Sequence, residues 1–251
     1  MKEYISDFFL LIQFLTRIPV NKSLPCEKEN FKKGAIFFPI IGLIVGGLQW
    51  IISCLFSKIL PPTITAVLAI AAAILITGGL HVDGWGDVFD GFFSFKGGKE
   101  KIIEIMKDSR IGAYAGIAIL CNILLKYSAI SYLIDKNLLN AIIIAPVVGR
   151  CSLIFISYIG KNAKKTGSGN IFIGNMDIKR VVISYLITAL ITIPLIGVKD
   201  GLVIMGSSII ITFLVNKFCE HYIDGLTGDT LGFTNEAVEQ LVLVVFIAIN
   251  M

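Results

Sequence analysis

Residues 35–56 read AIFFPIIGLIVGGLQWIISCLF, twenty-two consecutive positions without one charged side chain. A run of about 17–25 apolar residues is long enough to cross a lipid bilayer as a helix. Five further runs of this kind follow at about 63–80, 112–134, 138–159, 180–198 and 201–219, and a seventh, shorter run lies at about 238–250. The sequence therefore predicts an all-α fold, a polytopic integral membrane helical bundle with about six to seven transmembrane helices.

The composition supports this prediction. Of the 251 residues, 55% are hydrophobic and 16% are charged, against about 25% charged residues in a typical soluble domain. A soluble chain of this size could not bury so much apolar surface. The net charge of +4 is too small to indicate a nucleic acid partner. The expected surrounding is therefore the lipid bilayer, with no nucleic acid bound.

Basic residues predict how the spans are oriented. Loops on one side carry fourteen of them, whereas the other side carries only Lys58, Lys136 and Lys199. Because cytoplasmic loops are enriched in Lys and Arg, the first side is expected to be cytoplasmic. The long loops, at 81–111, 160–179 and 220–237, are all predicted on this side. Its basic residues are Lys28, Lys32, Lys33, Lys96, Lys99, Lys101, Lys107, Arg110, Lys161, Lys164, Lys165, Lys179, Arg180 and Lys217.

The N-terminal stretch at 4–18 is predicted to be an amphipathic helix. It places Asp7, Gln13 and Arg17 among apolar residues. This pattern favours a helix that lies at the membrane interface or packs on the bundle over one that crosses the bilayer.

A first polar cluster follows the second predicted span, where residues 78–91 read GGLHVDGWGDVFDG. Asp83, Asp87 and Asp90 stand at i, i+4 and i+7, which places them on one face of a helix. Like charges this close repel each other, and a hard divalent cation would relieve the repulsion. Mg²⁺ is usually held by one or two carboxylates together with substrate phosphates and water. A solvated helix face is the alternative, although the aromatic residues around the acids leave little of one. The role of His81, as an acid/base group or a structural residue, stays open.

Two further clusters contain groups that suit phosphate. Lys107-Asp108-Ser109-Arg110 offers a point charge and a guanidinium fork, although such residues also anchor the end of a span. Residues 225–236 read GLTGDTLGFTNE and contain Asp229, where a turn followed by acids at a helix N-terminus is the alternative. Together with the three aspartates, the cations favour phosphoryl transfer.

Two cations, Lys126 and Arg150, fall inside predicted spans. An intramembrane charge is costly and indicates a functional role by default. Arg150 lies near enough to the cytoplasmic end to reach an anionic substrate. Lys126 is mid-span, where it could pair with a carboxylate or extend toward the interface, and no role is assigned to it.

Four motifs resemble those of the cobalamin synthase family, the adenosylcobinamide-GDP ribazoletransferases: FLTRIP at 14–19, HVDGWGDVFDG at 81–91, EIMKDSRIG at 104–112 and GLTGDTLGFTNE at 225–236. The resemblance implies one integral membrane catalytic domain, residues 1–251, in the cytoplasmic (inner) cell membrane. It implies an enzyme of the last steps of vitamin B12 assembly that joins adenosylcobinamide-GDP, a corrinoid nucleotide, to α-ribazole or α-ribazole 5′-phosphate. GMP is released, Mg²⁺ is the expected cofactor, and a homo-oligomer is left open.

The chemistry of this reaction gives each cluster an expected role. Mg²⁺ on the diphosphate is expected to be held by Asp83, Asp87, Asp90 and Asp229. Either Asp87 or Asp90 is expected to take the proton from the attacking hydroxyl, with His81 as a further catalytic candidate. The expected substrate-binding residues are Lys107, Arg110, Arg150, Thr227 and Glu236.

Two other functions compete with this interpretation. A CDP-alcohol phosphotransferase also uses a membrane-embedded aspartate cluster, and Asp87-x-x-Asp90-Gly91 begins its pattern, but the Ala-Arg that should follow is absent. A cation transporter would hold its carboxylates near the middle of the bilayer, whereas these gather at a predicted edge together with Lys and Arg.

Overall fold

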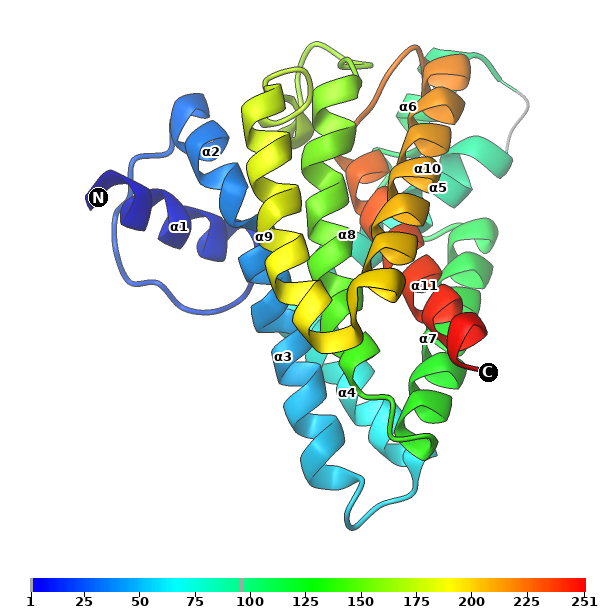
Figure 1. Ribbon diagram of the computed structural model, residues 1–251. Coiled ribbons are helices and arrows are strands. Elements are labelled where there is room, and N and C mark those ends of the chain that lie inside the picture. Colours follow the sequence, from blue (N-terminus) through cyan, green and yellow to red (C-terminus); the bar gives the residue numbers. More distant parts are fainter. Residues whose placement is uncertain (1, 95–96) are drawn as a thin grey trace.

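The computed structural model describes residues 2–94 and 97–251, so Lys96 lies outside the described residues. Within them the chain is helical (Figure 1). Two short 3₁₀ turns, η1 (Ala35–Phe37) and η2 (Ser168–Ile171), accompany the α-helices. The α-helices are α1 (Lys2–Leu15), α2 (Lys28–Gly34), α3 (Phe38–Phe56), α4 (Pro62–Thr77), α5 (Leu80–Phe93), α6 (Lys99–Ile105), α7 (Ala113–Asp135), α8 (Asn140–Ile159), α9 (Ile178–Ile196), α10 (Val198–Ile223) and α11 (Gly228–Asn250).

The predicted multi-pass architecture is confirmed. Among the described residues, six helical segments are long and apolar enough to cross a membrane, and α4 with α5 would make a seventh only as a bent pair. The N-terminal helix α1 is not one of the six, as its amphipathic sequence predicts. The six segments are Lys28–Phe56, Ala113–Asp135, Asn140–Ile159, Ile178–Ile196, Val198–Ile223 and Gly228–Asn250.

Two loop predictions are wrong. The stretch 220–237 is not a long loop, because α10 continues to Ile223 and α11 begins at Gly228. The backbone turns at Asp224, whose φ of 57° is left-handed, and the Thr227 side chain caps α11. The polar start of the last span is therefore helical, which gives α11 its spanning length. The stretch 81–111 likewise contains α5 and α6.

A sharp elbow separates α4 from α5. Gly78 and Gly79 both adopt left-handed φ values, 65° and 73°, which glycine reaches without steric cost. The two helices meet there at 91°. With 16 residues, α4 measures about 24 Å at 1.5 Å per residue. Helix α5 is therefore not part of any of the six long apolar segments, and it leaves the end of α4 almost at a right angle.

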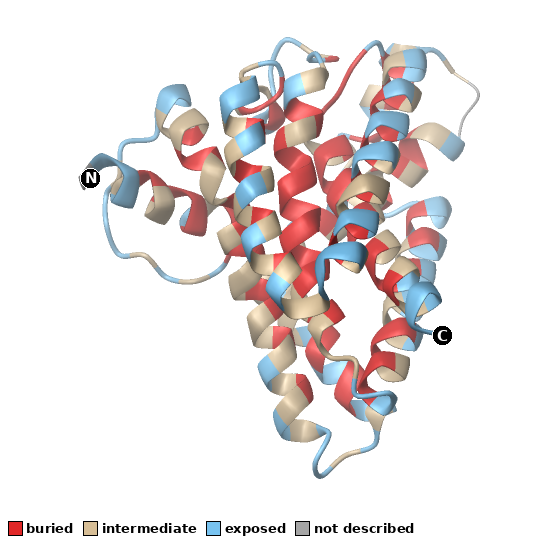
Figure 2. Cartoon of the chain, in the orientation of Figure 1, coloured by how far each residue is buried: buried red, intermediate tan, exposed pale blue. Residues whose placement is uncertain are grey.

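Helix α8 forms the centre of the bundle, with α3, α9, α10 and α11 packed around it (Figures 1 and 2). Small residues let α3 approach it closely. A Cβ at Gly42 would lie 2.6 Å from the Val147 Cα, and a Cβ at Gly46 would lie 2.9 Å from the Ile143 Cα. Gly42 and Gly46 thus form a small-xxx-small contact, which is a common way for membrane helices to associate.

The α3–α8 contact gives a stability prediction with a neighbouring control. Gly46→Val should lower the unfolding free energy by about 1–3 kcal/mol, the usual cost of overpacking, because the added methyl groups meet the backbone of α8. Gly47→Val makes the same chemical change at a position that faces open space, so it should cost much less. Thermal unfolding of the purified protein in detergent measures both. Equal losses would contradict the close backbone contact.

Candidate active site

The three aspartates of α5 lie on one helix, as predicted, but their surroundings differ. Asp83 is exposed, Asp87 is half-buried, and Asp90 is buried. The two carboxylate oxygens of Asp90 accept hydrogen bonds from the backbone amides of Gly112 (2.6 Å) and Ala115 (2.9 Å). These amides belong to the N-terminus of α7, where a carboxylate is favourable. Asp90 therefore holds α7 against α5.

Glycines bring α5 against α11. A Cβ at Gly84 would lie 2.7 Å from the carbonyl oxygen of Asp229, and a Cβ at Gly232 would lie 3.3 Å from the Cα atoms of Gly84 and His81. The two backbones are thus in direct contact. This crossing places Asp229, which is distant in sequence, beside the acids of α5.

The charges of this cluster act on one another. Burial, together with the carboxylates of Asp83, Asp229 and Asp90, raises the pKa of Asp87 to about 7. Lys164 opposes this shift, and its Nζ lies 3.9 Å from Oδ2 of Asp229. The cluster therefore carries more negative charge than the protein neutralises, and a bound cation would relieve the imbalance.

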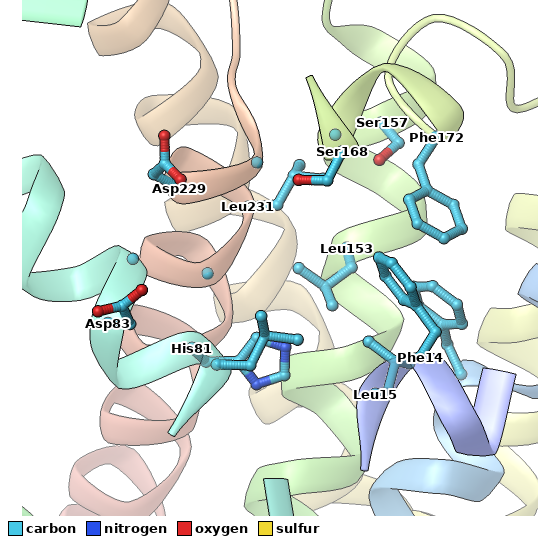
Figure 3. A pocket seen from close by; sticks show the side chains of 16 residues that line it. Phe14, Leu15, His81, Asp83, Leu153, Ser157, Ser168, Phe172, Asp229 and Leu231 are labelled. Atoms are coloured by element: carbon cyan, nitrogen blue, oxygen red, sulfur yellow. The ribbon is translucent and has the colours of Figure 1, made fainter. Parts of the chain in front are cut away.

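Asp83 and Asp229 line one wall of a cavity of about 100 Å³, and Phe14 and Phe172 lie on the opposite side (Figure 3). Its lining also includes the N-terminus of α11, with Gly228, and the η2 turn, with Ser168 and Gly169. The buried hydroxyl of Ser157 faces the same cavity and finds no hydrogen-bond partner among the described residues. A buried polar group of this kind points to a polar ligand or to water.

A second, open cavity of about 610 Å³ adjoins the first and shares Phe14, Leu80 and Asp83 with it. Arg17 lies in its wall, beside the Gly78–Gly79 elbow. The backbone amide of Arg17 donates to the carbonyl of Ile76 at 2.6 Å. The N-terminal segment is thus fastened to the elbow and forms one side of the candidate site.

The predicted metal ligands fit Mg²⁺ in part. No three His, Cys, Asp or Glu side chains converge on a metal-binding position within residues 2–94 and 97–251. Asp90 in particular is engaged by α7. Asp83, Asp87 and Asp229 remain, and one or two carboxylates are sufficient for Mg²⁺ when substrate phosphates and water supply the other ligands. This donor set therefore fits a metal that binds together with its substrate.

Three of the predicted substrate-binding residues line neither of the two cavities. Lys107 and Arg110 are exposed and line neither of them. Arg110 forms a bidentate pair with Asp108, with Nε 3.0 Å from Oδ1, and this hydrogen bonding lowers the pKa of Asp108 to about 2. Thr227 is buried and acts within the protein, where its hydroxyl donates to Oδ2 of Asp229 at 3.1 Å.

The other two, Arg150 and Glu236, belong to a buried charge network. Lys126 Nζ lies 2.8 Å from Glu236 Oε2 and 2.7 Å from Glu239 Oε2. Arg150 Nη1 pairs with Glu239 Oε1. The network contains two positive and two negative side chains from α7, α8 and α11, so its formal charges balance. Its arginine approaches the α5 ring of His81, with Arg150 Nη2 3.4 Å from His81 Nδ1.

Neutral side chains complete this network. Asn122 donates to Glu236 Oε2 at 2.7 Å and accepts a hydrogen bond from Gln240 at 2.9 Å. Asn235 donates to Glu239 Oε1 at 2.8 Å. Glu239 is therefore held through both carboxylate oxygens and Glu236 through Oε2 inside the protein, where sequence reasoning expected Glu236 to meet substrate.

Sequence reasoning also missed Lys164 and Arg17 as site residues. Lys164 appeared only as one of many loop cations, and no motif singled it out. Arg17 stood inside the FLTRIP motif at 14–19, so a signal for it was present. Lys164 reaches Asp229, and Arg17 reaches the open cavity that Asp83 lines, only when the segments at 14–19 and 160–170 fold onto α4, α5 and α11.

Comparison of the sequence with known proteins identifies its family. The family model for cobalamin-5-phosphate synthase matches residues 7–247. The chain belongs to this family. Relatives named adenosylcobinamide-GDP ribazoletransferase include one from Clostridium tetani (strain Massachusetts / E88), 53% identical over 247 residues and 98% of both chains. One from Clostridium kluyveri (strain ATCC 8527) is 49% identical over 99% of both chains. One from Clostridium botulinum (strain Okra / Type B1) is 45% identical over 99% of this chain and 100% of its own.

No solved structure matches the chain significantly. The family assignment therefore rests on sequence, and it extends over nearly the whole chain. The full-length relatives are named as enzymes. This member of the cobalamin-5-phosphate synthase family is therefore also an enzyme, a membrane-embedded transferase of cobalamin biosynthesis.

The buried network gives a second stability prediction. Lys126→Met should lower the unfolding free energy by about 3–5 kcal/mol, because it leaves a buried carboxylate without its partner. Adding Glu236→Gln removes that excess negative charge and should restore part of the loss. Lys136→Met, at the exposed end of the same helix, serves as the control and should change stability by less than about 1 kcal/mol. A double variant as unstable as the sum of its single changes would argue against the pairing. Denaturant unfolding in detergent compares the wild type with Lys126→Met, Glu236→Gln, the double variant and Lys136→Met.

Proposed function

We propose that the protein joins adenosylcobinamide-GDP to α-ribazole or α-ribazole 5′-phosphate and releases GMP. The full-length likeness to relatives of that name supports the substrates. The observation that carries the proposal is the meeting of Asp83 and Asp229, from different helices, at one cavity with Lys164 beside them. Such a site suits a substrate that brings its own phosphates and a divalent cation.

The reaction exchanges one phosphorus–oxygen bond for another. A ribose hydroxyl of α-ribazole attacks the phosphorus that carries the cobinamide, and the bond from this phosphorus to the bridging oxygen breaks. The electrons of that bond leave with GMP, and the hydroxyl proton must pass to a base. The protein's task is to position the two substrates and to balance the charge of the diphosphate.

Asp83 and Asp229 are the residues that would hold Mg²⁺ in this proposal. When bound, the ion neutralises charge on the diphosphate and on the leaving GMP. The N-terminus of α11 at Gly228 supplies a further favourable environment for a phosphate, since helix N-termini attract anions. Lys164 adds a positive charge on the same side.

Asp87 is the proposed general base. It lies one turn of α5 after Asp83 and interacts with the charges of Asp83, Asp229 and Asp90, and its raised pKa, about 7, suits a group that accepts a proton near neutral pH. Asp90, the other candidate, already accepts two backbone hydrogen bonds, which leaves its oxygens poorly placed to take a proton. We therefore assign Asp90 to the positioning of α7.

We expect the two cavities to receive different parts of the substrates, because they differ in size. A cavity of about 100 Å³ is too small for a corrin ring, so only the phosphates and part of a ribose would enter it. The open cavity of about 610 Å³ beside the elbow can receive a larger group, and Arg17 is placed there to meet a charged one. The corrin ring itself then lies at the surface.

Turnover by the purified protein tests this function. With Mg²⁺, adenosylcobinamide-GDP and α-ribazole, GMP should be released. Asp83→Asn and Asp87→Asn should each lower kcat by at least about a hundredfold, the scale of a lost acid/base group. Asp135→Asn, at the exposed end of α7, should leave it unchanged. Turnover of CDP-diacylglycerol with a polyol, without release of GMP, would replace this function by that of a CDP-alcohol phosphotransferase.

We further propose that the site faces the cytoplasm from the inner cell membrane, in line with the distribution of basic residues. Cysteine labelling in intact cells tests this orientation. Thr166→Cys, in the loop beside the site, should stay protected from an impermeant reagent. Lys58→Cys, in the turn between α3 and α4, should react. Both positions are exposed, and the labelling of the unaltered chain is subtracted. Reaction at Thr166→Cys alone would reverse the topology.

A further inference from the structure

His81 lies on a wall that two cavities share. It is the second residue of α5 and is buried, with 5% of its surface exposed. Its side chain lines the cavity that contains Asp83 and Asp229 (Figure 3). It also lines a smaller cavity of about 30 Å³, whose other walls include Lys126 and Arg150. The ring thus connects the candidate active site with the buried charge network.

The contact with Arg150 decides where the ring carries its proton. Arg150 Nη2 lies 3.4 Å from His81 Nδ1. A guanidinium group has only donors, so Nδ1 must accept, and a proton on Nδ1 would set two donors against each other. The single ring proton is then on Nε2. Among the described residues, no protein acceptor forms a hydrogen bond with Nε2, which leaves this N–H to the cavity.

Arg150 cannot itself reach the cavity. It is 2% exposed and is absent from the cavity lining. Its Nη1 pairs with the Glu239 carboxylate and donates to the carbonyl oxygen of Pro146 at 3.4 Å. Glu239 is held in turn by Lys126 and Asn235. The guanidinium group is therefore held through Nη1 on the side of the network, and among the described residues its hydrogen-bond partner on the side of the cavity is His81.

We propose that His81 is a hydrogen-bond donor to a charged phosphate oxygen, through Nε2–H, and that Arg150 is the positioning residue that fixes this tautomer. The inference rests on the proposed function and adds a role to its site. In this role His81 transfers no proton at any step. It stabilises the negative charge that grows on the phosphoryl oxygens as GMP leaves, as donors in oxyanion holes do.

The tautomer can be read directly, without turnover. The full chain has two histidines, so ¹⁵N-histidine labelling of the protein in detergent gives two sets of ring signals, and His221→Gln assigns them. The wild-type His81 should show a protonated Nε2 and an unprotonated Nδ1. Arg150→Lys, which keeps a donor, should preserve this pattern, and Arg150→Met should mix the tautomers. A wild-type ring protonated on Nδ1, or on both nitrogens, would overturn the inference whether or not the proposed function holds.

Substitutions at His81 separate donation from proton transfer. A Gln side chain can place an N–H near the position of Nε2, whereas an Asn side chain reaches only the position of Nδ1. His81→Gln should therefore keep kcat within about tenfold of wild type. His81→Asn should lose about 10²–10³-fold, the effect of removing one such donor, with little change in KM. Equal and complete loss in both variants would indicate that His81 transfers a proton and would overturn its role as a donor.

A double-variant cycle tests the role of Arg150. Arg150→Met should lower kcat in the wild-type protein but cause no further loss when His81 is already Ala. Losses that multiply would show that Arg150 acts independently of His81, against the inference. Because Arg150→Met removes one of the two cations that pair with Glu239, the cycle is repeated with Glu239→Gln in all members, where the same pattern is expected. Wild-type turnover reports on the proposed function separately.

Discussion

The buried charge network is the constraint on which the rest of the structure depends. Lys126, Arg150, Glu236 and Glu239 lie on three different helices, and each carries a charge that apolar surroundings disfavour. Sliding one helix by a single residue would separate at least one pair and leave charges uncompensated within the membrane. The network therefore fixes the relative register of α7, α8 and α11 more sharply than aliphatic packing could, because aliphatic side chains tolerate small shifts.

That register reaches the site through glycine contacts. A Cβ added at Gly149 of α8 would lie 2.9 Å from the Cγ atom of Glu239. Helices α8 and α11 are therefore closely packed where the network lies. One turn before the network, Gly232 of α11 meets α5 at Gly84 and His81. Two helices in backbone contact leave no side chains to absorb a shift. The distance between Asp83 and Asp229 thus follows from the position of α11, which the buried charges hold.

The sequence was sufficient to predict the spans, since long apolar runs have few alternatives in a chain this poor in charge. It could not place their polar ends. The run GLTGDTLGFTNE looked like a loop because Gly and Thr are weak helix formers, but a capped start and close packing on α5 make most of it helical. Helical periodicity likewise placed three aspartates on one face, but it could not show that α7 would begin where Asp90 can cap it.

The same limitation applies to the role of each charge. Sequence reasoning treated every cation near the predicted edge as a candidate for phosphate, because the positions of their partners were unknown. In the structure, Arg110 is occupied by a carboxylate two residues away, and Arg150 by one eighty-nine residues away. Lys164, which no motif marked, lies beside Asp229, and Arg17, which lies in the FLTRIP motif, lines the open cavity together with Asp83. Which cation pairs with which carboxylate depends on the folded chain. Arginines and lysines that look alike in the sequence can therefore have a structural role or a role at the site.

A site of this kind needs one part that is held rigidly and another part whose charges the protein leaves uncompensated. The network beneath His81 has balanced charges, and among its buried polar atoms only Arg150 Nε and Asn235 Oδ1 lack a hydrogen-bond partner within the described residues, so it has little capacity to bind an ion or a substrate. The acids above His81 have one cation nearby, at 3.9 Å, and they keep an excess of negative charge. The free energy of binding a metal and a diphosphate comes from the acids, whose charge the protein leaves uncompensated. The buried charge network fixes the positions of those acids. His81 contacts both parts, because its ring meets Arg150 of the network and lines the cavity of Asp83 and Asp229. The charge network that stabilises the bundle is therefore connected to the candidate active site through one buried ring.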